Sequence, residues 1–124
     1  MANSIKKLKQ LRHEFHQYPE LGFQETKTKT KIANFLRAKG LEVIEGVGVI
    51  GVLKSGSGSK TIGLRADMDA LPIQETSKHA YSSKHPGVMH ACGHDGHTTM
   101  LLGAAEELAN SLDFDGTVIF IFQP

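Results

Sequence analysis

The feature that most constrains the fold is residues 117–122, a run of six residues that is almost wholly apolar. Such a run is typical of a strand that is buried on both faces in a parallel sheet. Upstream, apolar residues recur at helical spacing in residues 25–39 and 96–110. Helices that alternate with buried strands predict an α/β layered domain.

The first residues predict another helix. Asn3 or Ser4 can cap its start, and Tyr18-Pro19 stops it. Gly40 follows the helix expected over residues 25–39, and we expect it to end that helix in a left-handed conformation.

Short β-branched runs predict three further strands, at residues 43–44, 49–53 and 61–66. The serine- and glycine-rich residues 55–59 are expected to form a hairpin turn between the last two. Residues 67–92 show no sustained period and predict a long ordered excursion, of the kind that is usually functional.

Length, net charge and the lengths of the apolar runs limit the classes of protein to which this chain can belong. The 124 residues fit one domain, and 14 Lys and Arg against 13 Asp and Glu give a net charge of +1. Such a charge creates no strong field for nucleic acid or an anionic membrane. No apolar run approaches the roughly 20 residues of a membrane span, and no hydrophobic signal region begins the chain. We therefore expect a cytoplasmic protein without nucleic-acid or membrane partners.

Residues 79–97 hold five of the seven histidines and the single cysteine. The core of this stretch, residues 89–97, reads Met-His-Ala-Cys-Gly-His-Asp-Gly-His. Gly93 alone separates Cys92 from His94, and without a Cβ it can take a positive φ that turns both side chains toward one point. Thiolate and imidazole together suit zinc or another late divalent ion, so Cys92 and His94 are candidate metal ligands. The alternative is a histidine-rich surface loop with Cys92 packed as a small apolar residue.

Two further stretches carry polar groups near the ends of predicted elements. Asp67 follows the strand expected over residues 61–66, where a carboxylate can orient a ligating imidazole; Asp69 is the second candidate. The alternative for Asp67 is a simple turn cap. His13 and His16 lie near a helix end, where we expect them to satisfy backbone carbonyls or the helix dipole rather than to bind metal.

Together, these stretches resemble the M20 family of metallo-amidohydrolases, in the branch with hippurate hydrolase, N-acyl-amino-acid amidohydrolases and plant auxin-conjugate hydrolases. The likeness covers essentially the whole chain and rests on four motifs in the same order. They are Arg12-His13 with Pro19-Glu20-Leu21-Gly22, then Gly63-Leu64-Arg65-Ala66-Asp67-Met68-Asp69-Ala70-Leu71-Pro72, residues 89–97, and Phe122-Gln123-Pro124.

The resemblance implies a three-layer αβα catalytic domain with a mixed, largely parallel sheet and a site for two divalent metal ions (Zn, Mn, Ni or Co). In that site Cys92 and His94 match metal ligands. Asp67 matches the catalytic aspartate that, in this family, orients a metal-binding residue. The broader family has a metal-binding histidine two residues before this aspartate. Here the position is Arg65, which cannot ligate a metal.

Family members continue after Phe122-Gln123-Pro124 with Ala-Glu-Glu, which supplies the general base and a further ligand. We thus expect residues 1–124 to be the amino-terminal part of the catalytic domain of a longer protein, without the rest of that domain or its inserted dimerisation domain. The resemblance implies a homodimeric parent that hydrolyses the amide bond of N-acyl or N-aroyl amino acids, and a chain that alone is inactive and binds metal weakly. Alternatives are a di- or carboxypeptidase of the same family and a non-catalytic metal- or ligand-binding module.

Overall fold

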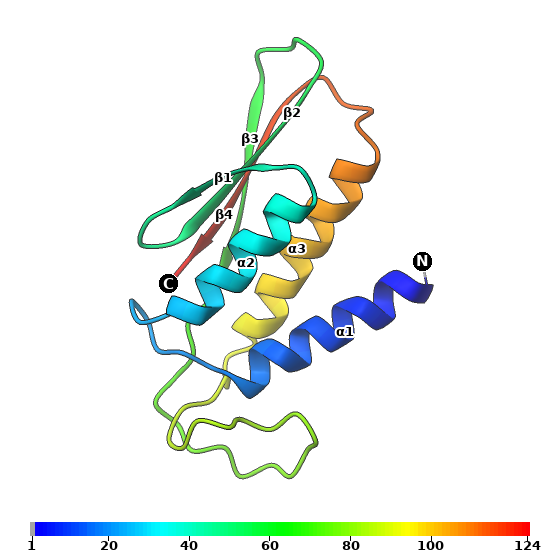
Figure 1. Ribbon diagram of the computed structural model, residues 1–124. Coiled ribbons are helices and arrows are strands. Elements are labelled where there is room, and N and C mark those ends of the chain that lie inside the picture. Colours follow the sequence, from blue (N-terminus) through cyan, green and yellow to red (C-terminus); the bar gives the residue numbers. More distant parts are fainter. Residues whose placement is uncertain (1) are drawn as a thin grey trace.

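The computed structural model describes residues 2–124, with side chains from residue 4 onward. Across this range the chain forms three helices and four strands (Figure 1). In chain order they are α1 (Ala2–Gln17), α2 (Thr26–Ala38), β1 (Glu42–Glu45), β2 (Val49–Ser55), β3 (Thr61–Asp67), α3 (His94–Asn110) and β4 (Gly116–Gln123). The helices and strands expected from the sequence are present at these positions, which confirms the α/β class.

β4 occupies the interior of the sheet because it pairs along both of its edges. Within residues 2–124 the strand order is β1-β2-β4-β3. β4 runs antiparallel to β2 and parallel to β3, and β1 forms an antiparallel pair with β2. The sheet is therefore mixed, as expected. Among the strands described, however, the β3–β4 pairing alone is parallel, so a largely parallel sheet is not what these residues form.

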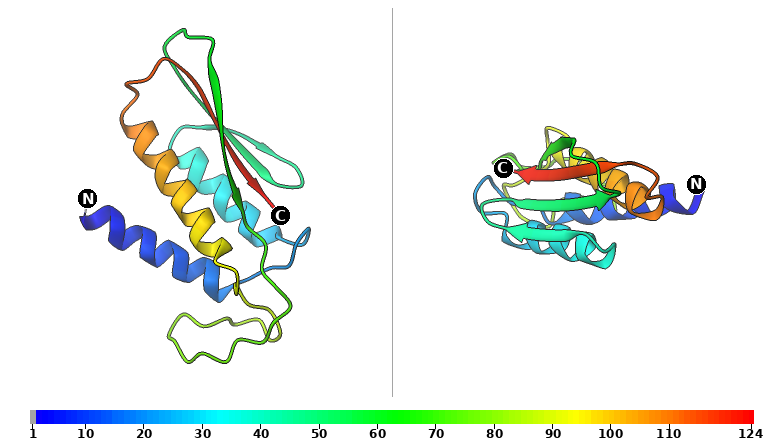
Figure 2. Two further views of the ribbon diagram at one scale, coloured as in Figure 1. Left: turned by 180° about the vertical axis from the view of Figure 1, so that it is seen from behind. Right: turned by 90° about the horizontal axis from the view of Figure 1, so that it is seen from above.

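The helices lie on one face of the sheet (Figure 2). α2 packs against β1 and β2, α3 packs against β3 and β4, and α1 packs against α3. Residues 2–124 thus provide the sheet and the helices of one face. The second helical layer of the expected three-layer arrangement is not formed by the residues that the structure describes.

Burial along β4 alternates, which shows where the core lies. Val118, Phe120 and Phe122 are buried on the side that the helices cover. Ile119 and Ile121 point to the opposite face and are only half-buried. The apolar run at residues 117–122 is therefore buried on one side in this chain, and not on both sides as the sequence predicted.

The serine- and glycine-rich residues 55–59 do not form the turn of a hairpin, contrary to the prediction. They join β2 to β3, and these strands do not pair with each other because β4 lies between them. Asp115, just before β4, holds the connection in place. Its Oδ1 accepts hydrogen bonds from the backbone N–H groups of Ser57 at 2.9 Å and Gly58 at 2.7 Å. The segment therefore crosses the end of β4.

Two helix ends agree with the predictions and one differs. α1 ends before Tyr18-Pro19, and Gly40 follows α2 with a φ of +86°. α1 begins at Ala2, so Asn3 and Ser4 lie within its first turn. The prediction that one of them caps the helix was wrong, because the helix already includes both.

Residues 68–93 are ordered and fold back onto the segment after α1, as Figure 1 shows below the helices. Leu71 and Met89 exchange two backbone hydrogen bonds, of 2.9 and 3.0 Å, which close the segment into a loop. The N–H of Ala70 also donates to the carbonyl of Glu20 at 2.8 Å. The prediction of a long ordered excursion is confirmed, and we call residues 68–93 the long loop.

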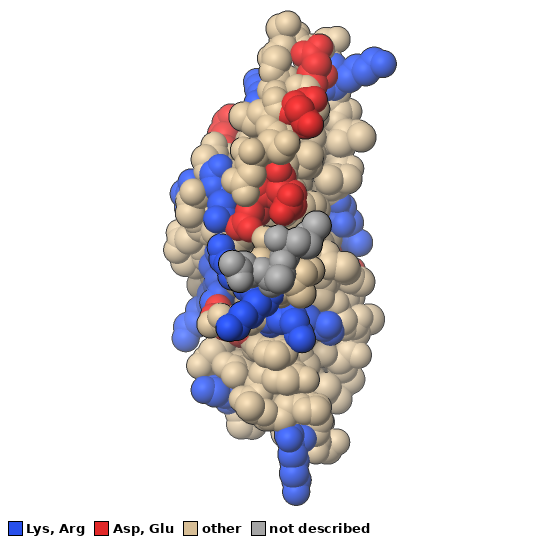
Figure 3. All heavy atoms as spheres, turned by 90° about the vertical axis from the view of Figure 1, so that its right-hand side faces the viewer, with Lys and Arg blue, Asp and Glu red and all other residues tan. Residues whose placement is uncertain are grey.

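Charges of opposite sign gather in different parts of the surface. Figure 3 shows acidic side chains mainly in the upper half of one face and basic side chains mainly across its middle, with further basic side chains near its top and at its bottom. On this face most acidic side chains therefore lie above most basic ones. None of the helices within residues 2–124 combines the length and the apolar character needed to cross a membrane.

Candidate metal centre

Gly93 sets the direction in which α3 leaves the long loop. It precedes His94, the first residue of the helix, and has a φ of +82°. Glycine takes this left-handed conformation at little steric cost, as the sequence predicted for this position. The helix then places His97 three residues after His94, and therefore on the same side. α3 begins at His94 and not near residue 96, because the turn at Gly93 already starts it.

Asp67 ends β3 and faces both imidazoles. Its Oδ1 lies 2.7 Å from Nδ1 of His97, and its Oδ2 lies 3.3 Å from Nε2 of His94. The hydroxyl of Thr98 donates to the backbone carbonyl of Asp67 at 3.0 Å, which ties β3 to the first turn of α3. One ligand atom from each of Asp67, His94 and His97 lies within 4.8 Å of the other two. We call these three residues the metal group.

Asp69 orients the His94 ring from the other side. Nδ1 of His94 lies 2.8 Å from Oδ1 of Asp69. A carboxylate only accepts hydrogen bonds, so Nδ1 carries a proton, and Nε2 is the ring nitrogen that faces Asp67. The structure thus puts Asp69, the second candidate of the sequence, in contact with the nitrogen through which a carboxylate orients a ligating histidine.

Cys92 is exposed and does not belong to the metal group. The structure therefore brings together two of the residues predicted for the site, Asp67 and His94. That Cys92 is a metal ligand stays a prediction. The structure also adds His97, to which sequence reasoning gave no role. The spacing of His94 and His97 within a helix is the signal by which His97 could have been found.

Electrostatics favour the ionised form of Asp67. Partial burial raises the pKa of Asp67, but the hydrogen bond from His97 and the charges of His94 and His97 outweigh burial and leave this pKa below its usual value. The guanidinium of Arg65 also lies nearby, with Nη1 at 3.6 Å from Oδ2 of Asp67. Asp67 is thus an anion that both imidazoles and one permanent cation face.

A second group of histidine and carboxylates lies on the buried side of α3, and we call it the buried bridge. Asp95 follows His94 in the helix, but its side chain is only 1% exposed. Nδ1 of His16 lies 2.9 Å from Oδ2 of Asp95, and Nε2 of His16 lies 3.1 Å from both carboxylate oxygens of Glu75. His16 therefore links α1 to α3 and to the long loop.

Each carboxylate of the buried bridge is held in its charged form. Burial raises the pKa of Glu75, but hydrogen bonds from Ser77, from the Ser83 N–H and from His16 lower it to about 2. Burial likewise raises the pKa of Asp95, and the hydrogen bond from His16 with nearby positive charge, including Arg12, brings it below its usual value. The bridge is a satisfied ionic network.

His13 and His16 have partners other than those expected. His16 lies in the last turn of α1, where the helix dipole acts, yet its ring nitrogens bind carboxylates and not backbone carbonyls. The His13 ring stacks on Tyr81, with centroids 3.8 Å apart, and His79 stacks on the same tyrosine at 4.9 Å. No pattern in the sequence pairs these residues, since Glu75, His79 and Tyr81 come from an aperiodic loop.

Two buried polar side chains lack hydrogen-bond partners among the described residues. His90 is 5% exposed, and burial lowers its pKa to about 4, so it is neutral at physiological pH. Glu25, just before α2, is 2% exposed, and burial raises its pKa. His90 belongs to the predicted motif, yet it lies outside the metal group.

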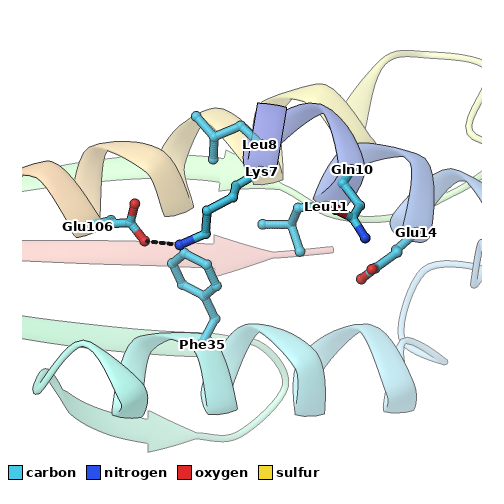
Figure 4. Close-up of a pocket in the computed structure, with 7 residues that line it drawn as sticks. All are labelled: Lys7, Leu8, Gln10, Leu11, Glu14, Phe35 and Glu106. Carbon is cyan, nitrogen blue, oxygen red and sulfur yellow. Dashed lines mark ion pairs between the residues drawn. The ribbon is translucent and has the colours of Figure 1, made fainter. Parts of the chain in front are cut away.

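Cavities of different chemistry border α1. One of about 250 Å³ lies beside the buried bridge, and Arg12, His13, Ser77 and Met89 are among the residues that line it. Another, of about 180 Å³, is shown in Figure 4, where Lys7 of α1 reaches toward Glu106 of α3. The second cavity is lined by apolar side chains together with Lys7, Glu14 and Glu106, and no histidine or cysteine is among its lining residues.

Comparison with protein-family models gives a match to the peptidase family M20/M25/M40 over residues 63–124. These residues are half of the chain and include most of β3, the long loop, α3 and β4. The chain therefore belongs to peptidase family M20/M25/M40. The resemblance stated from the motifs is confirmed.

Curated relatives include hydrolases of several substrates. The chain is 55% identical to hippurate hydrolase of Campylobacter jejuni over 117 residues, which cover 92% of this chain and 30% of that protein. It is 45% identical to thermostable carboxypeptidase 2 of Saccharolobus solfataricus, over 100% of this chain and 34% of the relative. It is 48% identical to an IAA-amino acid hydrolase of Arabidopsis thaliana, over 92% of this chain and 27% of the relative. The chain spans about a third of the length of the curated relatives that it matches.

Among solved structures, the Bacillus subtilis YXEP protein is similar to this chain with a TM-score of 0.95 and 41% identity. The match covers 99% of this chain and 36% of that one. That protein is described as a dinuclear metal-binding peptidase of the M20 family. The likeness confirms the mixed α/β fold over essentially the whole chain.

Proposed function

We propose that a protein containing this chain is a metal-dependent amidohydrolase. Its substrate is an N-acyl or N-aroyl amino acid of the hippurate kind, which it cleaves to a carboxylate and a free amino acid. The observation that carries the proposal is the convergence of Asp67, His94 and His97 where β3 and α3 meet, with His94 held by Asp69. The 55% identity to a hippurate hydrolase supports the substrate class.

The chemistry of the donor set fits a divalent metal. Imidazole nitrogen and carboxylate oxygen are ligands of Zn²⁺ and of related late ions such as Mn²⁺, Ni²⁺ and Co²⁺. We propose two such ions, held in part by His94 and by Cys92, whose thiolate would complete the predicted motif. When bound, such ions supply Lewis-acid activation of water and of the amide carbonyl.

This chain's own residues act by holding ligands in place. Asp69 accepts a hydrogen bond from Nδ1–H of His94 and so keeps Nε2 available as a ligand. Asp67 adds negative charge beside both histidines. We propose that residues 1–124 are the amino-terminal part of the catalytic domain, and that the general base, further ligands and an inserted dimerisation domain belong to the rest of the protein. On this proposal the whole enzyme is a cytoplasmic homodimer, and the chain alone is inactive.

A second candidate is a carboxypeptidase or dipeptidase with the same metal site. The observation that favours it is the likeness to thermostable carboxypeptidases 1 and 2 of Saccharolobus solfataricus, at 48% and 45% identity. The two activities differ in the group that supplies the carbonyl of the cleaved amide, which is a simple acyl group in the first and an amino-acid residue in the second.

The test uses the whole protein that contains this chain. We expect it to release glycine from hippurate, to lose this activity in a chelator, and to regain it with Zn²⁺ or Mn²⁺. Cys92→Ala should remove both bound metal and activity. Faster hydrolysis of dipeptides than of hippurate would favour the second candidate. Activity that a chelator leaves intact, with no metal in the purified protein, would contradict both.

A further inference from the structure

We propose that Phe23 contacts the acyl side of the substrate, and that its ring packs against the aromatic ring of a bound N-aroyl amino acid. The inference rests on the proposed function and deepens it, because it assigns the preference for an aroyl group to one side chain. Three observations converge on this residue: the exposure of its ring, its backbone conformation and its place beside the proposed metal centre.

The Phe23 ring is exposed to an unusual degree. Phe23 is 81% exposed, more than any other large apolar residue that the structure describes. The ring takes no part in the hydrophobic core or in the ring pairs of the described residues. Removal of an aromatic ring from water is favourable, so Phe23 offers a surface on which an apolar group can pack.

The backbone at Phe23 is strained. The N–H of Gln24 donates to the carbonyl of Leu21 at 2.9 Å, so residues 21–24 form a turn with Phe23 as its third residue. Phe23 has a φ of +67°, and among the described residues it is the one non-glycine residue with a positive φ. A glycine would adopt this conformation at less cost. Strained residues of this kind cluster at ligand-binding positions.

The turn packs against the residue that holds His94. A Cβ added to Gly22 would lie 3.7 Å from the Cβ of Asp69. Asp69 in turn lies 2.8 Å from Nδ1 of His94, through its Oδ1. Phe23 follows Gly22 in the chain, and it therefore lies beside the support of a proposed metal ligand.

Hydrogen bonds on both sides of the turn fix its position. The N–H of Ala70 donates to the carbonyl of Glu20 at 2.8 Å, which ties the turn to the start of the long loop. The carboxylate of Glu20 accepts from the N–H groups of Lys27 at 3.1 Å and Thr28 at 2.6 Å, at the start of α2. A ring carried by an ordered turn loses little conformational freedom when a ligand packs against it.

The position of Phe23 suits an aroyl group. In an N-aroyl amino acid the aromatic ring is bonded directly to the carbonyl carbon that is attacked, so this ring must lie close to the metal centre. Two aromatic rings attract each other in offset-stacked or edge-to-face arrangements, with centroids about 4.5–7 Å apart. An acetyl group has no ring to place there. Phe23 should therefore discriminate between aroyl and acetyl substrates.

The test compares hippurate with N-acetylglycine, which differs from it only in the acyl group, as substrates of the whole protein that contains this chain. Phe23→Ala should lower kcat/KM for hippurate by on the order of fivefold or more, and change kcat/KM for N-acetylglycine by less than about twofold. Phe23→Tyr keeps the ring and should retain most of the hippurate activity. Leu112→Ala is the matched control, because Leu112 is also an exposed apolar residue but follows the far end of α3. It should leave both values unchanged.

Metal content and thermal unfolding show whether the substitution acts on the substrate. Both should be the same for Phe23→Ala and for the natural protein. An equal fall in kcat/KM for the two substrates, or an unchanged value for hippurate, would overturn the inference and leave the proposed function standing. Hydrolysis of neither substrate by the natural protein would overturn the proposed function, and the inference with it.

Discussion

The metal group and the buried bridge are built from the same residue types, yet the structure uses them in opposite ways. His94 and Asp95 are neighbours in α3, and each joins a different group. The metal group lies near the surface, where His97 is half exposed. In the buried bridge, the Asp95, Glu75 and His16 side chains are 1%, 3% and 12% exposed.

The two groups differ in how many histidine ring nitrogens already make hydrogen bonds to carboxylates. In the buried bridge each ring nitrogen of His16 binds a carboxylate, and Glu75 also accepts from Ser77 and Ser83. A ring nitrogen that donates a proton has no lone pair for a metal. In the metal group, Asp69 takes Nδ1 of His94 and Asp67 takes Nδ1 of His97, so each of these rings has only one nitrogen in a hydrogen bond to a carboxylate. Histidines near carboxylates therefore mark a metal site only when a lone pair remains.

The largest effect should come from removing the centre of the buried bridge. His16→Phe removes the imidazole that the buried carboxylates of Asp95 and Glu75 share, which should lower the free energy of unfolding by about 3 kcal/mol. Urea denaturation of the chain, followed by circular dichroism, measures this. His79→Gln is the control, because His79 also packs against Tyr81 but contacts no carboxylate. It should lower the free energy of unfolding by less than about 0.5 kcal/mol. A stability of His16→Phe equal to that of the control would show that the bridge is not a stabilising network.

The next effect is a loss of stability in acid. The pKa of Glu75 is about 2 in the folded chain, below the ordinary value of 4.5 that we expect in the unfolded chain, so the folded form binds this proton less readily. The ionised Glu75 carboxylate therefore stabilises the folded state above about pH 4.5, and this stabilisation is lost as the pH falls toward about 2. Unfolding free energies measured across this range should fall less steeply for Glu75→Gln than for the natural chain. Parallel curves for the two chains would assign the acid sensitivity to other carboxylates.

A smaller effect is expected at the metal group from Asp69→Asn. The amide is a weaker acceptor for the Nδ1 proton of His94, so Zn²⁺ affinity should drop by about tenfold. Titration calorimetry of the chain measures the change. Asp113→Asn, at an exposed position after α3, is the control and should bind Zn²⁺ as the natural chain does. Unaltered affinity in Asp69→Asn would mean that this hydrogen bond does not prepare His94 as a ligand.

The smallest effect is expected from Arg65→Gln, and it has the opposite sign. Loss of the cation 3.6 Å from Asp67 should tighten Zn²⁺ binding by about two- to fivefold, because the arginine is half exposed and its charge is well screened. The gain should shrink as salt is added. Lys54→Gln removes a charge from β2 without contact to the metal group and serves as the control. Weaker binding in Arg65→Gln would mean that Arg65 supports Asp67 instead of competing for it.

Local patterns predicted the elements well, because spacing and apolar runs act within a few residues. They placed the helix observed at Thr26–Ala38 over residues 25–39, and they joined Asp67 to His94 through motif residues. They failed where partners are distant in the chain. The bond between His16 and Glu75 spans 59 residues, and the position of β4 between β2 and β3 depends on pairing that no local signal encodes.

The place of β4 has a consequence for how the chain acquires its structure during synthesis. β2 and β3 leave the ribosome before β4, although β4 must separate them. The short link at residues 55–59 brings the two earlier strands together and favours direct pairing between them. We therefore expect the slow step in folding to be the entry of β4, the last strand to be made, between β2 and β3.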